Sequence, residues 1–198
     1  MLASITPLGE RARRSRWGST VAAFAIGSTL AGAALGALAG ALGSVLLGGA
    51  GDDRWRLLVL AGFVALGLLL DLQVGGLRVP TTRRQVNEDW LVRYRGWIYG
   101  AGFGAQLGAG VFTIVTTAAV YLVPLAAFLL GSAGLGLLVG AVFGLVRGAS
   151  ILPAARTGDT GGLMALHRRM RAWEPAGRRA VLAIQAALLA SALAGAIT

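Results

Sequence analysis

The chain has 198 residues, of which 56% are hydrophobic and 13% are charged, and its mean hydropathy is +0.73. Because a water-soluble domain carries about 25% charged residues, this composition excludes an ordinary soluble domain and indicates a single polytopic membrane domain. The net charge of +10 would suggest nucleic-acid binding in a soluble protein. Here the arginines flank apolar runs and are explained by membrane topology, so no nucleic-acid partner is expected.

The first seventeen residues are polar and basic, and an apolar run follows from 18 to 49. A secretory signal has an apolar core of about 7–15 residues before its cleavage site. Since this run is much longer, we expect a retained membrane helix after a basic N-terminal segment, 1–17.

The rest of the chain alternates apolar runs with two basic segments. At about 20 residues per crossing, this pattern predicts an all-α integral membrane protein with five transmembrane helices in one domain, 18–198. The predicted helices cover 18–49, 55–74, 96–130, 134–153 and 180–197, and the predicted loops are 75–95 and 154–179.

The arginines predict the orientation. Four of them precede the first helix, five lie in 75–95 and six lie in 154–179, whereas aspartates offset Arg54 and Arg56 in the turn between the first two helices. Basic segments face the cytoplasm. We therefore expect a bacterial cytoplasmic (inner) membrane protein whose N-terminus and two basic loops are inside. Arginine without any lysine is typical of a high-GC bacterium.

Two of the apolar runs are longer than one crossing needs. As one helix, 96–130 would be about 50 Å long, and 18–49 has a similar excess. We expect these helices to tilt, to bend at glycines or to break around a re-entrant piece, with Pro124 as the predicted break in the later run. A count of six helices, in which one long run is split, is the alternative.

A possible internal duplication has a period of about 80 residues, because LLVLAGFVALGLL at 57–69 aligns with LLVGAVFGLVRGA at 137–149. Internal repeats are a common plan of transporters. Sequences rich in alanine, glycine and leucine also produce such matches by chance, so both readings stay open.

Glycines at intervals of four residues are the strongest pattern. This spacing leaves one helix face bare, so neighbouring backbones can approach closely. The interpretation is a tightly packed bundle or an oligomer seam, and a pore lined by bare backbone is the alternative. The predicted helix-packing residues are Gly32, Gly36, Gly40, Gly100, Gly104, Gly108, Gly136, Gly140, Gly144 and Gly148.

A line of polar residues crosses the run 96–130 at a spacing that would place them on one helix face. A glutamine within a membrane should find a hydrogen-bond partner on another helix, and Gln185 is the candidate partner for Gln106. The line is therefore either interhelical hydrogen bonding or a path for a substrate. The substrate-path candidates are Gln106, Thr113, Thr116, Thr117 and Tyr121.

Asp71 and Arg147 are the ionisable residues expected inside or near the hydrocarbon layer. On the five-helix topology they lie at a comparable depth. Charges at such a depth are costly and often functional. We therefore predict an intramembrane ion pair that gates or couples transport, with a structural pair or a simple interfacial anchor as the alternative.

The segment GGLMALHRRMRAW, 161–173, is amphipathic. Its apolar face holds Leu163, Leu166, Met170 and Trp173, and its polar face holds His167, Arg168, Arg169 and Arg171. Such a helix suits the surface of an anionic membrane. The expected partners are the lipid bilayer, anionic lipid at the arginine-rich loops, and either a second copy of the chain or another membrane protein. Docking of a cytoplasmic partner is the alternative use of this helix.

No catalytic constellation is present in the sequence. HExxH, GxSxG and phosphate-loop motifs are absent, and GxGxxG-like glycines occur only within an apolar span. The lack of cysteine excludes disulfides, thiol relays and haem attachment, and the single histidine, His167, cannot form a metal cluster alone. We expect neither an enzyme nor a cofactor or metal site.

Two pieces, GAGFGAQLGAG at 100–110 and GLGLLVGAVFGLVRG at 134–148, resemble the cytochrome-c-biogenesis and DsbD-like transmembrane superfamily, which is related to LysE-type exporters. Redox members of that superfamily carry a Pro-Cys pair where this chain has Thr-Ile-Val-Thr-Thr, so their disulfide chemistry does not carry over. The resemblance implies a duplicated, transporter-like bundle with another cargo.

The first functional hypothesis is a small polytopic, transporter-like protein that moves a small solute or ion. The alternative is a non-catalytic membrane subunit or accessory protein that packs within a larger membrane complex. A lipid-handling enzyme is disfavoured because paired acids and bases are missing.

Overall fold

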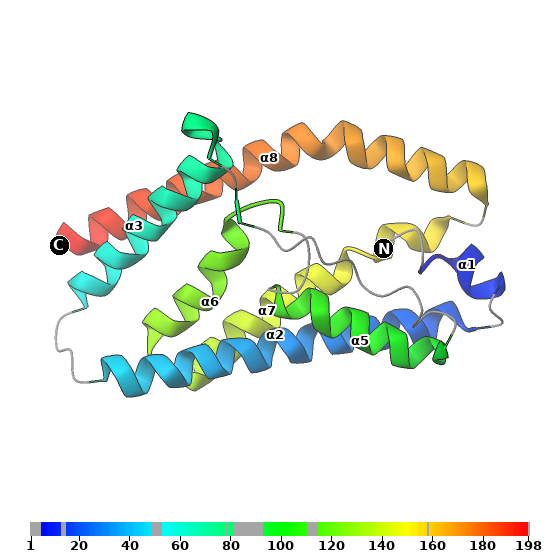
Figure 1. Ribbon diagram of the computed structural model, residues 1–198, viewed down its shortest axis with the longest axis horizontal. Coiled ribbons are helices and arrows are strands. Elements are labelled where there is room, and N and C mark those ends of the chain that lie inside the picture. Colours follow the sequence, from blue (N-terminus) through cyan, green and yellow to red (C-terminus); the bar gives the residue numbers. More distant parts are fainter. Residues whose placement is uncertain are drawn as a thin grey trace.

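The computed structural model describes residues 5–12, 15–48, 53–77, 79–80, 93–110, 115–157 and 159–197, and over these residues the protein is all-α. Its described helices are α1 (Pro7–Ala12), α2 (Trp17–Leu47), α3 (Arg54–Asp71), α5 (Gly96–Ala109), α6 (Ala119–Leu130), α7 (Ala133–Ala149) and α8 (Thr160–Ile197), with two short 3₁₀ helices, η1 (Val74–Gly76) and η2 (Leu152–Arg156). Figure 1 shows two groups of helices, with α3 beside α8 in one and α2, α5 and α7 together in the other.

Three helices of the described residues are long and apolar enough to cross a membrane. They are α2, α7 with its continuation through η2, and α8. The shorter α6 is also apolar. These helices agree with an all-helical membrane protein, while the number of crossings stays a prediction.

Helix α2 packs on α7 through bare backbone. Gly32 contacts Gly140 and Gly36 contacts Gly136, so the two helices run antiparallel. A Cβ atom added at Gly36 would collide with the carbonyl oxygen of Gly136. Only glycine permits such a close approach of two helices.

Helix α5 packs on another face of α2 and runs parallel to it. Gly104 lies against Phe24, and Gly108 lies against Ser28. Ser28 is fully buried, and its hydroxyl donates a 2.6 Å hydrogen bond to the carbonyl oxygen of Gly144 in α7. Ser28 therefore stands where α2, α5 and α7 meet.

Helices α3 and α8 form an antiparallel pair, because Gly195 meets Leu57 near one end and Arg178 reaches Asp71 near the other. Helix α6 joins this pair to the other group through contacts with α3, α2 and α7. The two halves of the proposed internal repeat belong to α3 and α7, which lie in different groups.

The predicted helix 96–130 is divided into two helices, a break that its excess length leads us to expect. Helix α5 ends at Ala109, Gly110 takes a φ of +71°, and α6 begins only at Ala119. The predicted break at Pro124 is wrong, since Pro124 lies inside α6. Glycine ends a helix readily in the left-handed conformation, whereas a proline within a membrane helix loses one backbone hydrogen bond that its surroundings can replace.

The two pieces of this run are short. At 1.5 Å per residue, α5 is about 21 Å long and α6 about 18 Å, while the hydrocarbon layer is about 30 Å thick. In Figure 1, α5 runs from one end of the molecule to its middle, and α6 continues toward the other end. Neither helix alone is long enough to cross that layer.

The last helix is longer than predicted. Helix α8 begins at Thr160, so most of the predicted loop 154–179 is helical and continues into the predicted helix 180–197. Pro175 lies within α8 and does not end it. Much of the other predicted loop, 75–95, lies outside the described residues.

Candidate functional site

The interruption between α5 and α6 is closed by a side chain from α3. The N-cap residue of α6 is Ala118, which has no side-chain acceptor. The Asp71 carboxylate takes this place, because its Oδ1 accepts the Ala118 N–H at 2.9 Å and its Oδ2 accepts the Thr117 hydroxyl at 2.6 Å. Thr117 Oγ1 in turn accepts the Ala119 N–H at 3.2 Å. An anion is stabilised at a helix N-terminus, so Asp71 suits this position.

Gln185 of α8 completes the group, which we call the Asp71 cluster: Asp71, Thr117 and Gln185. The Gln185 Nε2 amide donates to Asp71 Oδ2 at 2.8 Å. Gln185 is only 1% exposed, and its Oε1 atom is buried without a hydrogen-bond partner in the described part of the chain. The cluster therefore has one buried acceptor atom without a donor. A buried amide oxygen without a hydrogen bond destabilises the folded protein.

Small residues bring the three elements of the cluster together. A Cβ atom added at Gly67 of α3 would lie 3.3 Å from the Ala118 Cβ and 3.9 Å from Gln185 Nε2. Beyond the carboxylate, Arg178 donates to the main-chain oxygen of Asp71 at 2.9 Å and so caps the end of α3. The lone pairs of the Asp71 carboxylate are not used by this bond.

The predicted ion pair between Asp71 and Arg147 is not formed among the described contacts. Asp71 lies in α3 and bonds to Thr117 and Gln185, whereas the Arg147 guanidinium lies 5.3 Å from the centre of the Phe143 ring within α7. Helices α3 and α7 belong to different groups. Two residues predicted at the same depth in the membrane therefore need not be in contact.

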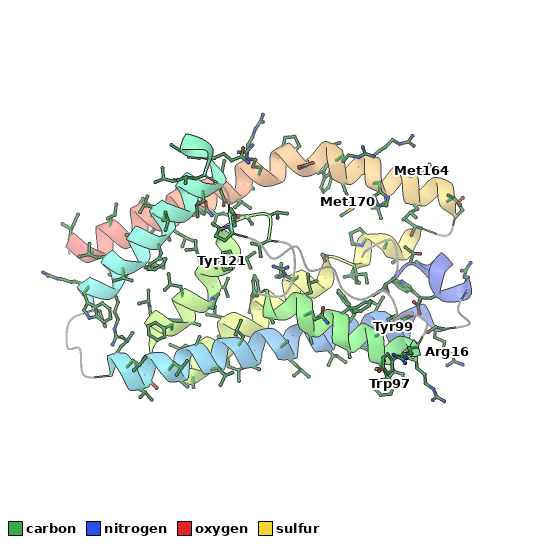
Figure 2. The ribbon with its side chains drawn as sticks, viewed as in Figure 1. Arg16, Trp97, Tyr99, Tyr121, Met164 and Met170 are labelled. Carbon is green, nitrogen blue, oxygen red and sulfur yellow. The ribbon has the colours of Figure 1, made fainter. Side chains whose placement is uncertain are left out.

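The predicted substrate path does not form one helix face, because the helix ends before its last members. Gln106 is half-buried in α5, Thr116 is exposed, and Thr113 lies outside the described residues. The Tyr121 hydroxyl donates to the main-chain oxygen of Pro80 at 2.6 Å (Figure 2). Of the four candidates that lie within the described residues, only Thr117 belongs to the cluster.

The proposed partner for Gln106 is also wrong, since Gln185 donates to Asp71. The sequence predictions pair Asp71 with Arg147 and Gln185 with Gln106, and they place Thr117 in the polar line. No sequence spacing relates them, because the hydrogen bonds span 46 and 114 positions.

A second polar group, which sequence reasoning missed, lies at the opposite end of α5. Glu10 of α1 is fully buried, and it accepts hydrogen bonds from the Thr20 hydroxyl at 2.8 Å and from the Tyr99 hydroxyl. These bonds tie the N-terminal segment to α2 and α5. The available signal was that Glu10 is the single acid among the first seventeen residues.

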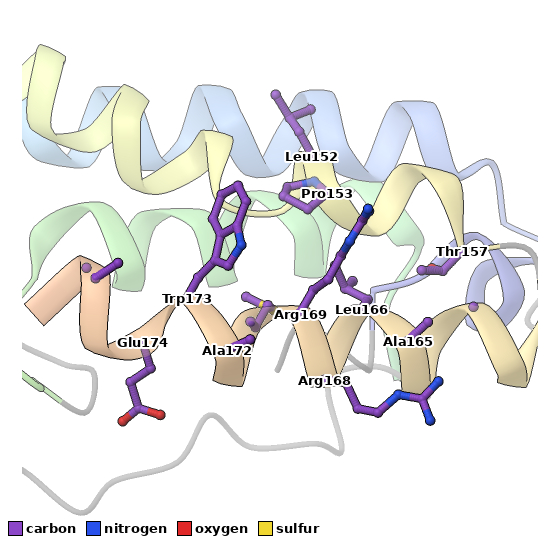
Figure 3. Close-up of a pocket in the computed structure, with 14 residues that line it drawn as sticks. Leu152, Pro153, Thr157, Ala165, Leu166, Arg168, Arg169, Ala172, Trp173 and Glu174 are labelled. Atoms are coloured by element: carbon purple, nitrogen blue, oxygen red, sulfur yellow. The ribbon is translucent and has the colours of Figure 1, made fainter.

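An apolar groove of about 1560 Å³ lies between the first half of α8 and η2. In Figure 3, Trp173 and Arg169 of α8 point toward Leu152 and Pro153, while Arg168 points away. Trp173 remains 76% exposed. Met164 and Met170 lie along the same stretch of α8 (Figure 2), and of the two only Met170 belongs to the apolar face that the pattern of 161–173 predicts.

The chain is similar to the methylamine utilization protein MauF of several bacteria. It is 34% identical to that of Paracoccus versutus over 148 residues, covering 72% of this chain and 53% of the relative. Identity to the Methylorubrum extorquens protein is 35% over 127 residues, covering 63% and 42%, and to the Paracoccus denitrificans protein 35% over 141 residues, covering 70% and 49%. The chain thus spans about half the length of the curated relatives it matches. No family model and no solved structure matches it.

Proposed function

We propose that this MauF-like membrane protein is transporter-like and moves a small solute or ion in support of methylamine utilisation. The names of its relatives supply the link to methylamine. The observation that carries the proposal is the interruption between α5 and α6, which the Asp71 cluster closes at the start of α6. Transporters commonly build their sites where a membrane helix is broken near mid-membrane.

Physical constraints on backbone in lipid support this reading. Irregular backbone at membrane depth is tolerated where it is buried in protein or lines a polar cavity. The segment before α6 is held by side chains from α3 and α8, which contact the other helix group mainly through α6 and η2. A shift of the α3–α8 pair would therefore make or break the hydrogen bonds of the cluster, which is the kind of movement that alternating access requires.

The test is flux into proteoliposomes that contain the purified chain, using labelled methylammonium, glycine and sodium. We expect saturable flux of at least one of them. Thr117→Val should lower this flux about tenfold, because it removes one charge-assisted hydrogen bond from Asp71. The matched control, Ser191→Ala on an exposed position of α8, should retain it. Folded protein that moves none of the three solutes would refute transport.

A second candidate, an accessory subunit of a larger membrane complex, is favoured by one observation. The first half of α8 carries exposed apolar side chains, Met164 and Trp173, beside the groove at η2. A partner would be retained during purification in mild detergent and lost on Trp173→Ser. Purification of a single protein species from its native membrane would count against this role.

A further inference from the structure

We propose that the Asp71 cluster binds a small primary ammonium ion of the size of methylammonium. This inference rests on the proposed function and names the class of substrate for the same site. It is carried by the juxtaposition of the Asp71 carboxylate with the unfilled, buried Oε1 atom of Gln185.

The count of hydrogen-bond acceptors indicates what is missing. A carboxylate offers about four lone-pair positions, and three of those on Asp71 are taken by Ala118, Thr117 and Gln185. A side-chain amide oxygen offers two more, and within the described part of the chain neither is filled on Gln185 Oε1. About three acceptor positions therefore lie within one cluster, and a primary ammonium group carries three N–H donors.

Charge favours a cation in the same place. The Asp71 carboxylate gives the cluster its negative charge, and hydrogen bonds between ionised groups are roughly twice as strong as neutral ones. The cationic side chain of Arg178 also reaches Asp71, but its guanidinium is exposed and bonds to the main-chain oxygen of Asp71. It therefore leaves the free acceptors of the cluster available.

The surroundings favour a small ligand with an apolar end. Gly67 and Ala118 border the cluster on α3 and at the start of α6. A methyl group suits such a wall, whereas a metal ion would need further oxygen ligands. Among the described residues, no group of three or more histidine, cysteine, aspartate or glutamate side chains is found that suits a metal.

The test is binding to the full chain in lipid nanodiscs, measured by calorimetry with methylammonium, tetramethylammonium and sodium as separate probes. We expect saturable binding of methylammonium and none of tetramethylammonium, which has no N–H donor. Equal binding of tetramethylammonium would overturn the inference, and so would tighter binding of sodium.

Two variants locate the binding. Asp71→Asn keeps the size of the side chain but removes its charge, and Gln185→Met keeps the length but removes Oε1. Each should weaken methylammonium binding roughly ten- to hundredfold, while Ser191→Ala should not change it. Unchanged methylammonium affinity in folded Asp71→Asn would overturn the inference. If Gln185→Met does not fold, the affinity of Asp71→Asn alone tests the site.

Comparison with flux separates the two proposals. Binding of methylammonium at the cluster without any flux would uphold the site and refute transport. Methylammonium flux that Asp71→Asn leaves intact would uphold transport and refute the site.

Discussion

Glu10 is fully buried although it lies in a segment that composition marks as polar and basic. Burying a carboxylate is costly unless hydrogen-bond donors surround it, and here Thr20 and Tyr99 supply two of them. Tyr99 is itself 1% exposed and packs against Phe103 of α5. These hydrogen bonds connect α1 to α2 and α5, and they lie beside an apolar cluster that includes Ile5.

Tyr99→Phe should therefore lower the free energy of unfolding by about 1–3 kcal/mol, because it leaves a buried carboxylate with one donor fewer. Chemical or thermal unfolding in detergent measures the change. Tyr121→Phe is the matched control, since the Tyr121 hydroxyl bonds to Pro80 at an exposed position, and its loss should cost less. Equal losses for the two variants would contradict the role assigned to Glu10.

At the scale of elements, the glycines differ in what they contact. Gly36 of α2 lies against the backbone of Gly136, whereas a Cβ atom added at Gly62 of α3 would meet nothing within 4 Å. Both sit inside helices that sequence reasoning predicts. Only Gly36 belongs to a row of glycines that faces another helix. The sequence around a single glycine does not show whether a second helix packs against it.

Gly36→Ala should accordingly destabilise the protein by about 1–3 kcal/mol or more through overpacking. Gly62→Ala should be neutral or stabilising by up to about 1 kcal/mol, because alanine is the better helix former. Unfolding of the two variants under one detergent condition makes the comparison. If Gly36→Ala is as stable as Gly62→Ala, α2 and α7 do not touch through their backbones.

The break in the 96–130 run shows the limit of local rules. Proline predicts a break by its missing N–H group, yet Pro124 lies within α6. The interruption falls between Gly110 and Ala119, where the Asp71 carboxylate from α3 satisfies the start of the second helix. A contact made 47 positions away thus fixes where α6 begins.

At the scale of the whole molecule, the helix ends fall into two sets. The beginnings of α2, α5 and α8 lie at one end of the molecule in Figure 1, and the beginnings of α3 and α7 lie at the other with the C-terminus. Helix α1 and the beginnings of α2 and α8, which are next to arginines in the sequence, share the first end. This arrangement is compatible with the orientation that the arginines predict.

Single introduced cysteines test that orientation cleanly, because the chain has none of its own. In spheroplasts, a membrane-impermeant maleimide should label Asp53→Cys, at an exposed position before α3. Thr160→Cys, at the exposed start of α8, should react only after permeabilisation. The reverse pattern would place the N-terminus outside, and labelling of both without permeabilisation would deny that the two ends lie on opposite sides.

The sequence by itself determined the helical membrane class, the approximate positions of the long apolar helices and the spacing of the glycines. These follow from composition and short-range periodicity, which one stretch of chain carries alone. Only the tertiary structure decided that Asp71 bonds to Thr117 and Gln185, that Glu10 is buried, and that α5 and α6 are separate helices. Each of these depends on a hydrogen bond or close packing between residues far apart in the chain, and no local pattern encodes such a partner.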